Sequence, residues 1–407
     1  MSRAISSILP RHVLGRRLPT SSAVARVALL SRRHQHTVSA SEAAKDMWNR
    51  FKGTKQVREQ ILDENQLQKL SYTLGRRTLY NDREPYFDDA LGKNIMVPNM
   101  KQDLRTIDKD LVSSHYAPVK VIAIPQGYHL VYFTPDGVEG ELGPDGTDVT
   151  YNAPAPFTRR MWAGGRMRWA TDEPGAQWQD ILRRDTRGQD VKLVVGDWVR
   201  ETTTLRSVTP KVGRNGGEML LVEVRKDFET DRGLALVDER SWIFRPESMD
   251  ASPAAEHRLR DAVITGPSTV RDLFPGEEEK GYHRRELRWS PTGLFRFSAL
   301  TFNGHKIHYD PAWTAAVEGH PGCVVHGPLN LICMLDYWRD HCPTDAHPAV
   351  REVKYRALAP VYAGETYEIK AEKIGENEWE VLVRKEGRTC MMGQIIAFQG
   401  REGGRGD

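Results

Sequence analysis

Two short stretches in the last third of the sequence carry residue types that could handle a proton beside a carbonyl group. Asn303, His305 and His308 lie within six residues of one another, and Gly327 stands directly before Pro328 and an apolar run. An imidazole can accept a proton near neutral pH, and free N–H groups at a helix start favour negative charge. Together they could supply a base and an anion-stabilising amide, which removal of a proton next to a carbonyl requires.

The residues after Gly327 predict the elements that would position these groups. Residues 328–341 place apolar side chains at helical spacing on a broad face. Alternating apolar residues then predict four strands, at 353–358, 366–374, 378–384 and 390–398. One long helix followed by antiparallel strands suits a curved sheet wrapped around that helix.

An earlier part of the chain repeats this order of elements. Its predicted strands cover 166–169, 198–208, 218–225 and 234–244. A Gly196-Asp197 bend precedes the long strand here, and Gly364-Glu365 precedes the long strand in the later part. We interpret the two parts as an internal duplication, with an insertion at 172–192 in the first copy only. Upstream, residues 41–51 and 57–74 are predicted to be helical, with Ser41 as a cap.

The composition limits the class of protein and its partners. Of 407 residues, 39% are hydrophobic and 28% charged, and no apolar run approaches the ~18–20 residues that span a bilayer. Residues 1–41 hold seven Arg, many Ser and no Asp, Glu or Lys, which is typical of a mitochondrial transit peptide; the alternative is a disordered basic tail. Without these seven, the chain has 51 of its 58 basic residues and all 55 acidic ones, so acidic residues are in slight excess. This balance argues against nucleic acid as a partner. We therefore expect a protein of the mitochondrial matrix.

The stretch Phe297–Tyr309, with the His326-Gly327 turn, resembles the hydratase-2 motif of the MaoC-like hot-dog hydratases and dehydratases. The segment Arg160–Trp169 resembles the degenerate first half of two-domain members. The resemblance runs from near residue 45 to residue 400, and is nearest to mitochondrial type 2 hydroxyacyl-thioester dehydratases and mesaconyl-CoA-type hydratases. It implies an α+β double hot dog, in which two antiparallel curved sheets each wrap round a long helix. It also implies reversible hydration of an enoyl thioester without a metal or redox cofactor.

The resemblance predicts where the domains begin and end. Residues 42–246 would form a degenerate N-terminal hot-dog domain that shapes the acyl pocket and performs no chemistry. Residues 247–281 would be a polar surface linker, 282–400 the catalytic hot-dog domain and 401–407 a disordered tail. One chain would then supply both halves of a hot-dog pair, so we expect a monomer or a homodimer.

The motif departs from the family at one position. The family pattern is roughly Ser-Gly-Asp-x-Asn-Pro-x-His, whereas this chain reads Thr301-Phe-Asn303-Gly-His305-Lys-Ile-His308. Asn303 takes the place of the Asp, and an amide cannot accept a proton as a carboxylate does. A mechanism with Asp as a second base at this position is therefore excluded.

We predict three catalytic residues. His308 transfers the α proton, Asn303 binds the water or hydroxyl group through its amide, and the N–H of Gly327 stabilises the enolate oxygen. The alternatives are a structural histidine at a helix start, a structural loop amide and a packing glycine. The sequence leaves open whether Glu318 supplies the second acid or base or is a solvated loop residue.

Other residues near the motif are predicted to bind substrate. His305 and His326 could line the pocket, and His320 or His326 could orient the ring of His308. Lys306 is a candidate for binding a carboxylate-bearing substrate. Arg166, with neighbouring arginines of the first half, could bind phosphates of coenzyme A or of a carrier protein; the alternative is a charged sheet edge.

A zinc site is the rival from another chemical class. The histidines at 305, 308, 320 and 326 have H-x-x-H and H-x₅-H spacing. No thiolate pair accompanies them, and the four cysteines of the chain form no C-x-x-C. We therefore predict no metal site.

The sequence thus predicts a hydro-lyase that interconverts 3-hydroxyacyl and trans-2-enoyl thioesters, as a dehydratase of mitochondrial fatty acid synthesis. Its partner would be an acyl-CoA or acyl-carrier-protein thioester. One alternative keeps the chemistry and acts on a branched or dicarboxylic acyl-CoA such as mesaconyl-CoA. A second is a protein that binds acyl thioesters without turnover.

Overall fold

A computed structural model describes residues 38–76, 86–88, 93–95, 123–170, 192–213, 216–246, 264–274, 283–342 and 349–398. Residues 1–38 form a separate unit from the chain that starts at Ser39. The predicted transit peptide, apart from its last four residues, lies outside the described ranges, as do residues 172–191 of the insertion and the tail at 401–407.

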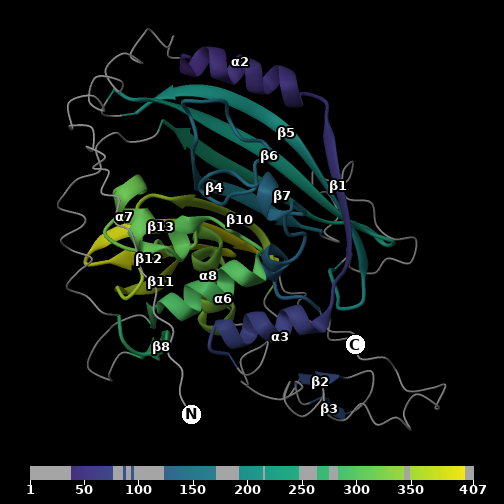
Figure 1. Cartoon of the computed structure of the whole chain (residues 1–407). Coiled ribbons are helices and arrows are strands. Elements are labelled where there is room, and N and C mark those ends of the chain that lie inside the picture. The colour runs from purple at the N-terminus through teal and green to yellow at the C-terminus, as the bar shows by residue number, and fades with distance from the viewer. Residues whose placement is uncertain are drawn as a thin grey trace, which may run out of the picture. The chain divides into compact units, whose positions relative to one another are not determined.

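An eleven-stranded antiparallel sheet organises the chain from Ser39 onward, in the order β1-β5-β6-β7-β4-β10-β13-β12-β11-β9-β8 (Figure 1). The first-half strands are β1 Lys55–Ile61, β4 Arg159–Trp169, β5 Trp198–Val212, β6 Glu218–Thr230 and β7 Gly233–Arg245. The second-half strands are β8 Thr269–Leu273, β9 Arg284–Arg288, β10 Val350–Ala357, β11 Thr366–Gly375, β12 Glu378–Lys385 and β13 Arg388–Ala397. A separate pair, β2 Tyr86–Asp88 and β3 Lys93–Ile95, forms a two-stranded sheet.

The two halves of the large sheet have the same strand order. The series β1-β5-β6-β7-β4 matches β9-β11-β12-β13-β10 element for element, and pairing of β4 with β10 joins the halves. The repeat that the sequence predicted is therefore present. Because β4 and β10 are neighbours, one strand of the first half lies directly beside the second half.

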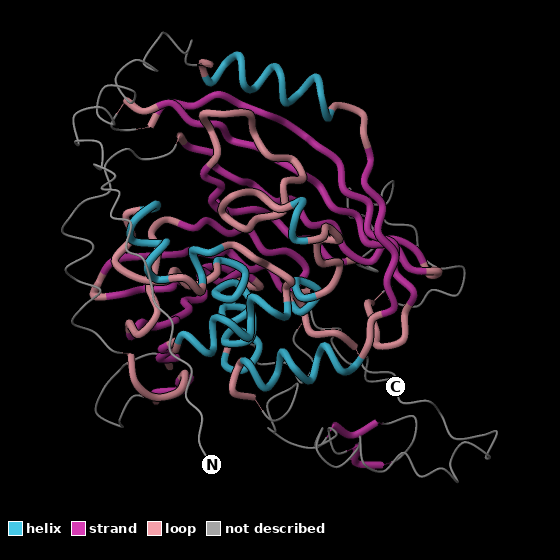
Figure 2. Tube along the Cα trace, viewed as in Figure 1, coloured by secondary structure: helices cyan, strands magenta, loops and turns pink. Residues whose placement is uncertain are grey.

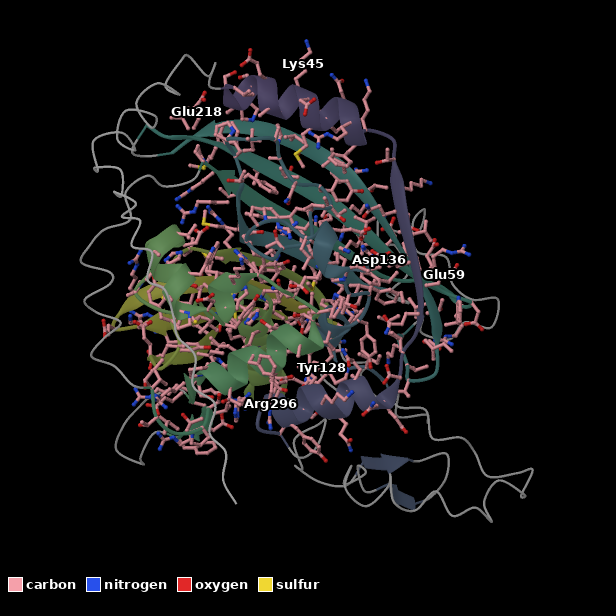
Figure 3. All side chains as sticks on the ribbon, in the orientation of Figure 1. Lys45, Glu59, Tyr128, Asp136, Glu218 and Arg296 are labelled. Atoms are coloured by element: carbon pink, nitrogen blue, oxygen red, sulfur yellow. The ribbon has the colours of Figure 1, made fainter. Side chains whose placement is uncertain are left out.

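Helix α8, Gly327–His341, is the centre of the second half. It packs against β11 and β12, whose alternating buried residues include Ile369, Val381 and Val383. Leu329, Trp338 and most other side chains of α8 are buried, and each large apolar side chain removed from water contributes about 1.5–3 kcal/mol. The helix predicted over 328–341 is thus confirmed, with the sheet curved around it (Figures 1 and 2).

Two of the described α-helices belong to the first half. In α2, Ala40–Phe51, Ser39 and Glu42 form a capping box, so the cap is Ser39 and not the predicted Ser41. Helix α2 packs on β5 and β6 and buries Met47 in a core shared with these strands. Between α3, Glu64–Thr73, and β4 the described residues contain β2, β3 and two 3-10 turns but no α-helix. Among the described residues, therefore, a helix as long as α8 occurs only in the second half.

Two further predictions about local structure were wrong, and one helix was missed. Residues 57–74 are not one helix, because Lys55–Ile61 forms β1 and only Glu64–Thr73 is helical; pairing of β1 with β5 outweighs the weak helical pattern. The predicted linker at 247–281 contains β8, which pairs with β9. Helix α6, Pro291–Leu300, was not predicted. None of the helices in the described ranges combines the length and apolar character that a membrane crossing requires.

Candidate active site

The loop that carries Asn303 and His305 begins where α6 ends. Thr301 caps the helix, and Phe302 takes a left-handed conformation, with φ of 48°. This turn lets the N–H of Asn303 donate to the carbonyl of Ser298 at 2.8 Å. The side-chain oxygen of Asn303 then accepts from the N–H of His305 at 3.1 Å. The loop is thereby fixed before it reaches the 3-10 helix Lys306–His308.

His308 is held as a neutral imidazole with its proton on Nδ1. Nδ1 lies 2.8 Å from the carbonyl oxygen of Val324, and since a carbonyl only accepts, Nδ1 must carry the hydrogen. The lone pair is therefore on Nε2. Burial lowers the pKa of His308 to about 4, and the bond to Val324 offsets only part of this effect. Near neutral pH the side chain is an unprotonated base, as the predicted proton transfer requires.

His326 forms a flat surface against which the ring of His308 lies. The two rings stack with centroids 3.6 Å apart and an interplanar angle of 17°. Nε2 of His326 lies 2.9 Å from the hydroxyl of Ser298. Because Ser298 belongs to α6, this helix fixes the ring of His326. Burial, and then the neighbouring His308 and His305, lower the pKa of His326 well below its usual value. Protonation of both stacked rings is therefore disfavoured, and the stacking supports the prediction that His326 orients His308.

Gly327 is the first residue of α8, where a backbone N–H has no acceptor within the helix. A Cβ at this position would lie 2.2 Å from Cε3 of Trp162 on β4, so only glycine fits without a shift. The ring of Trp162 is itself packed on Tyr355, with centroids 4.9 Å apart. The first half of the chain therefore builds one wall beside the predicted oxyanion amide.

His305 lies between His308 and a loop of the first half. Its ring meets that of His308 edge to face at 5.5 Å, and its Nε2 is 3.8 Å from Oδ2 of Asp145. At Gly146, φ is 81° and a Cβ would lie 2.1 Å from the carbonyl oxygen of Gly304, so the two backbones touch. Burial, followed by the charges of His308 and Arg160, lowers the pKa of His305 well below its usual value.

The other predicted residues have partners away from the imidazoles. Lys306 donates from Nζ to the carbonyl of Pro144 at 2.9 Å. Arg166 pairs with Glu352 on β10. It lines an open groove over the sheet, and none of the three predicted catalytic residues lines that groove. Substrate binding by Lys306 or Arg166 stays a prediction.

Glu318 and His320 also have partners among the described residues. Arg159 forms an ion pair with Glu318 and donates to its backbone carbonyl at 3.1 Å, which places this carboxylate against a guanidinium. Nδ1 of His320 lies 3.1 Å from the hydroxyl of Tyr362. In the described part of the chain, no three His, Cys, Asp or Glu side chains form a group that could hold a metal ion.

Sequence reasoning missed Trp162, Asp145 and Ser298, which surround the predicted residues. Trp162 and Asp145 are far from residue 305 in the sequence, and only the β4–β10 pairing and the packing of the Gly146 loop bring them close. Ser298 lies within the motif stretch, but its bond to His326 depends on how α6 packs against the start of α8.

A single antiparallel sheet built of two equivalent halves, with a central helix in the second, defines the protein as a double hot dog. The chain belongs to the family of type 2 hydroxyacyl-thioester dehydratases, which matches residues 127–363. The protein is thus an enzyme of the hydratase and dehydratase type.

Named relatives fall in the same group. The mesaconyl-C(4)-CoA hydratase of Chloroflexus aurantiacus is 28% identical over 265 residues, which are 64% of this chain and 79% of that protein. The mitochondrial type 2 hydroxyacyl-thioester dehydratase of Schizosaccharomyces pombe is 23% identical over 270 residues, covering 64% and 81%. A solved MaoC-like dehydratase aligns with a TM-score of 0.49 at 12% identity, over 87% of this chain and 100% of that one.

Proposed function

We propose that this enzyme interconverts 3-hydroxyacyl thioesters and trans-2-enoyl thioesters, with His308 as the proton-transfer group. The observation that carries the proposal is the state of His308. Its Nδ1 is bound to Val324, its ring is stacked on His326, and residue 327, next to that ring, begins α8. A neutral imidazole and a helix-start amide are the two groups that the chemistry needs.

The dehydration balances with these groups alone. Nε2 of His308 takes the α proton, and the electron pair of the C–H bond moves toward the thioester carbonyl, whose oxygen the N–H of Gly327 stabilises. The C–C double bond then forms as the β C–O bond breaks, and the hydroxide leaves as water with the proton from His308. The low pKa of His308 makes its imidazolium a ready acid for this second step.

Asn303 and His305 are proposed to hold the hydroxyl group or the attacking water. The side-chain oxygen of Asn303 is bound to the N–H of His305, which leaves the amide NH₂ to donate to an oxygen of the substrate. The neutral ring of His305 lies at the edge of the His308 ring. In the hydration direction the same groups would orient the water that His308 deprotonates.

We propose two alternative classes of substrate. The mitochondrial relative in S. pombe and the Arg-rich, acid-free N-terminus support a dehydratase of mitochondrial fatty acid synthesis in the matrix, acting on a thioester of coenzyme A or a carrier protein. The C. aurantiacus relative, whose identity is higher, supports a branched or dicarboxylic acyl-CoA instead. Turnover of crotonyl-CoA, mesaconyl-CoA and an enoyl-carrier protein, compared on one preparation, distinguishes the two classes of substrate.

The catalytic assignment is tested by replacing His308 with Ala. Hydration of crotonyl-CoA should fall by about 10²–10⁴-fold, the usual contribution of a positioned general base. Circular dichroism and thermal unfolding of the variant check that it folds. Turnover close to that of the wild type would remove His308 from the mechanism, and tight acyl-CoA binding without product in the wild type would favour a non-catalytic binding protein.

A further inference from the structure

Arg160 on β4 differs from the other arginines of its strand. Arg159 pairs with Glu318, Arg166 with Glu352 and Arg168 with Glu239. No carboxylate of the described residues lies at ion-pair distance from Arg160. Its only hydrogen bond among them runs from Nη1 to the carbonyl of Thr150 at 3.4 Å, the long end of the range.

Among the described residues, the surroundings of Arg160 leave its guanidinium without an anion of its own. The side chain is partly buried and lies over the ring of Trp242 at 5.3 Å. The charges of Asp148 and Asp145 act on Arg160, but each of these carboxylates accepts from the backbone and hydroxyl of a threonine two residues later. Burial lowers the pKa of Arg160, and these two carboxylates offset only part of the effect.

Arg160 faces the candidate active site. Arg160 and Trp162 pair in regular register with Phe244 and Trp242 of β7, so both side chains lie on one face of the strand, about 7 Å apart. The ring of Trp162 covers the start of α8 at Gly327. Arg160 is therefore two residues along β4 from Trp162, whose ring lies beside the predicted oxyanion amide of Gly327.

From this placement we infer that Arg160 binds a carboxylate carried by the acyl group, so that the preferred substrates are monothioesters of dicarboxylic acids. A partly buried guanidinium without a counter-ion is unfavourable, and a carboxylate matches its planar pair of donors. The phosphates of a carrier present the same anionic chemistry, but the acyl group is the part of the substrate that the proposed reaction brings to Gly327. The inference rests on the proposed function and selects the dicarboxylic acyl group from its two substrate alternatives.

Two acyl groups of matched shape separate the effect of charge from that of size. The crotonyl and fumaryl groups differ only in a terminal methyl or carboxylate. Each is offered as its coenzyme A thioester and as its N-acetylcysteamine thioester, which has no phosphate. The wild type, Arg160→Gln and Arg160→Lys are compared, with Arg206→Gln, an exposed strand arginine, as the matched control.

We expect Arg160→Gln to lower kcat/KM for fumaryl thioesters at least 30-fold with both carriers, and for crotonyl thioesters by less than 3-fold. Arg160→Lys should restore part of the fumaryl activity, and Arg206→Gln should match the wild type. Equal losses on both acyl groups would show a structural role and overturn the inference. A loss confined to coenzyme A thioesters would assign Arg160 to phosphate, which also overturns it.

The two proposals fail in different ways. If the wild type hydrates crotonyl but not fumaryl thioesters, the carboxylate inference is wrong and the proposed function stands. If the wild type hydrates neither acyl group nor an enoyl-carrier protein, or if His308→Ala keeps full activity, the proposed function fails regardless of Arg160.

Discussion

Replacing Gly327 with alanine tests whether the start of α8 is fixed against Trp162. The added Cβ would lie 2.2 Å from Cε3 of the ring, where ordinary contact begins at 3.4 Å, so something must shift by about 1.2 Å. The ring is confined by Tyr355, which is buried, at 4.9 Å, and by its strand pairing with Trp242. We therefore expect the first turn of α8 to move and to carry the oxyanion amide with it.

A displacement of about 1 Å in a catalytic group can lower turnover about 10²-fold, and the overpacking should cost about 1–3 kcal/mol of unfolding free energy. Steady-state hydration of crotonyl-CoA gives kcat, and urea unfolding gives stability. Gly322→Ala is the matched control, because a Cβ there meets nothing within 4 Å. The double variant Gly327→Ala/Trp162→Leu makes room for the methyl group and should regain part of kcat. Wild-type kcat and stability in Gly327→Ala alone would refute the reasoning.

Two further predictions concern the stacked imidazoles. The pKa of His308 is about 4 in the folded protein, against an ordinary value of 6.5. As the pH drops, the unfolded chain therefore binds a proton at His308 before the folded protein does. The free energy of unfolding should fall by about 3 kcal/mol between pH 6.5 and pH 4. Urea unfolding between pH 7 and 4 measures this loss of stability, and the loss should be smaller in His308→Gln. The same dependence of stability on pH in that variant would contradict the prediction. For His326, the phenylalanine variant keeps a stacking ring and should retain more kcat on crotonyl-CoA than the alanine variant, with similar KM. Equal kcat in the two variants would show that stacking does not position His308.

The sequence predicted those parts of the structure that local pattern determines. Apolar spacing and Pro328 place α8 correctly to within a residue, and alternation in β12, where Val381 and Val383 are buried, marks the strands. The strand β1 was taken for the start of a helix because the leucines at 62, 67, 70 and 74 lie near one helical face, and Val57 and Ile61, both exposed, mark no buried strand face. Its structure comes from pairing with β5, about 140 residues later, and no local pattern reports such a pairing.

The candidate site shows the same division between local and distant information. Asn303, His305 and His308 are close in sequence, and the backbone bonds of one short loop hold them together. By contrast, the contact of Trp162 with residue 327 and that of Asp145 with His305 join the two halves of the chain. Motif spacing can therefore predict candidate reacting groups, whereas the side chains that surround them follow from how the halves pair.

The pairing of β4 with β10 allows the two halves of the duplicated chain to take different roles. Once the second half supplies a base and a helix-start amide, the first half needs no reacting groups of its own. Its strand β4 still lies against the start of α8, because the joint between the halves is a continuous backbone ladder. We therefore expect the side chain of Arg160 on β4 to tolerate substitution with little effect on the proton chemistry at His308. On the same grounds we expect substrate choice and catalysis to be carried by different halves of one sheet, with variants of β4 altering which acyl groups react more than how the proton moves.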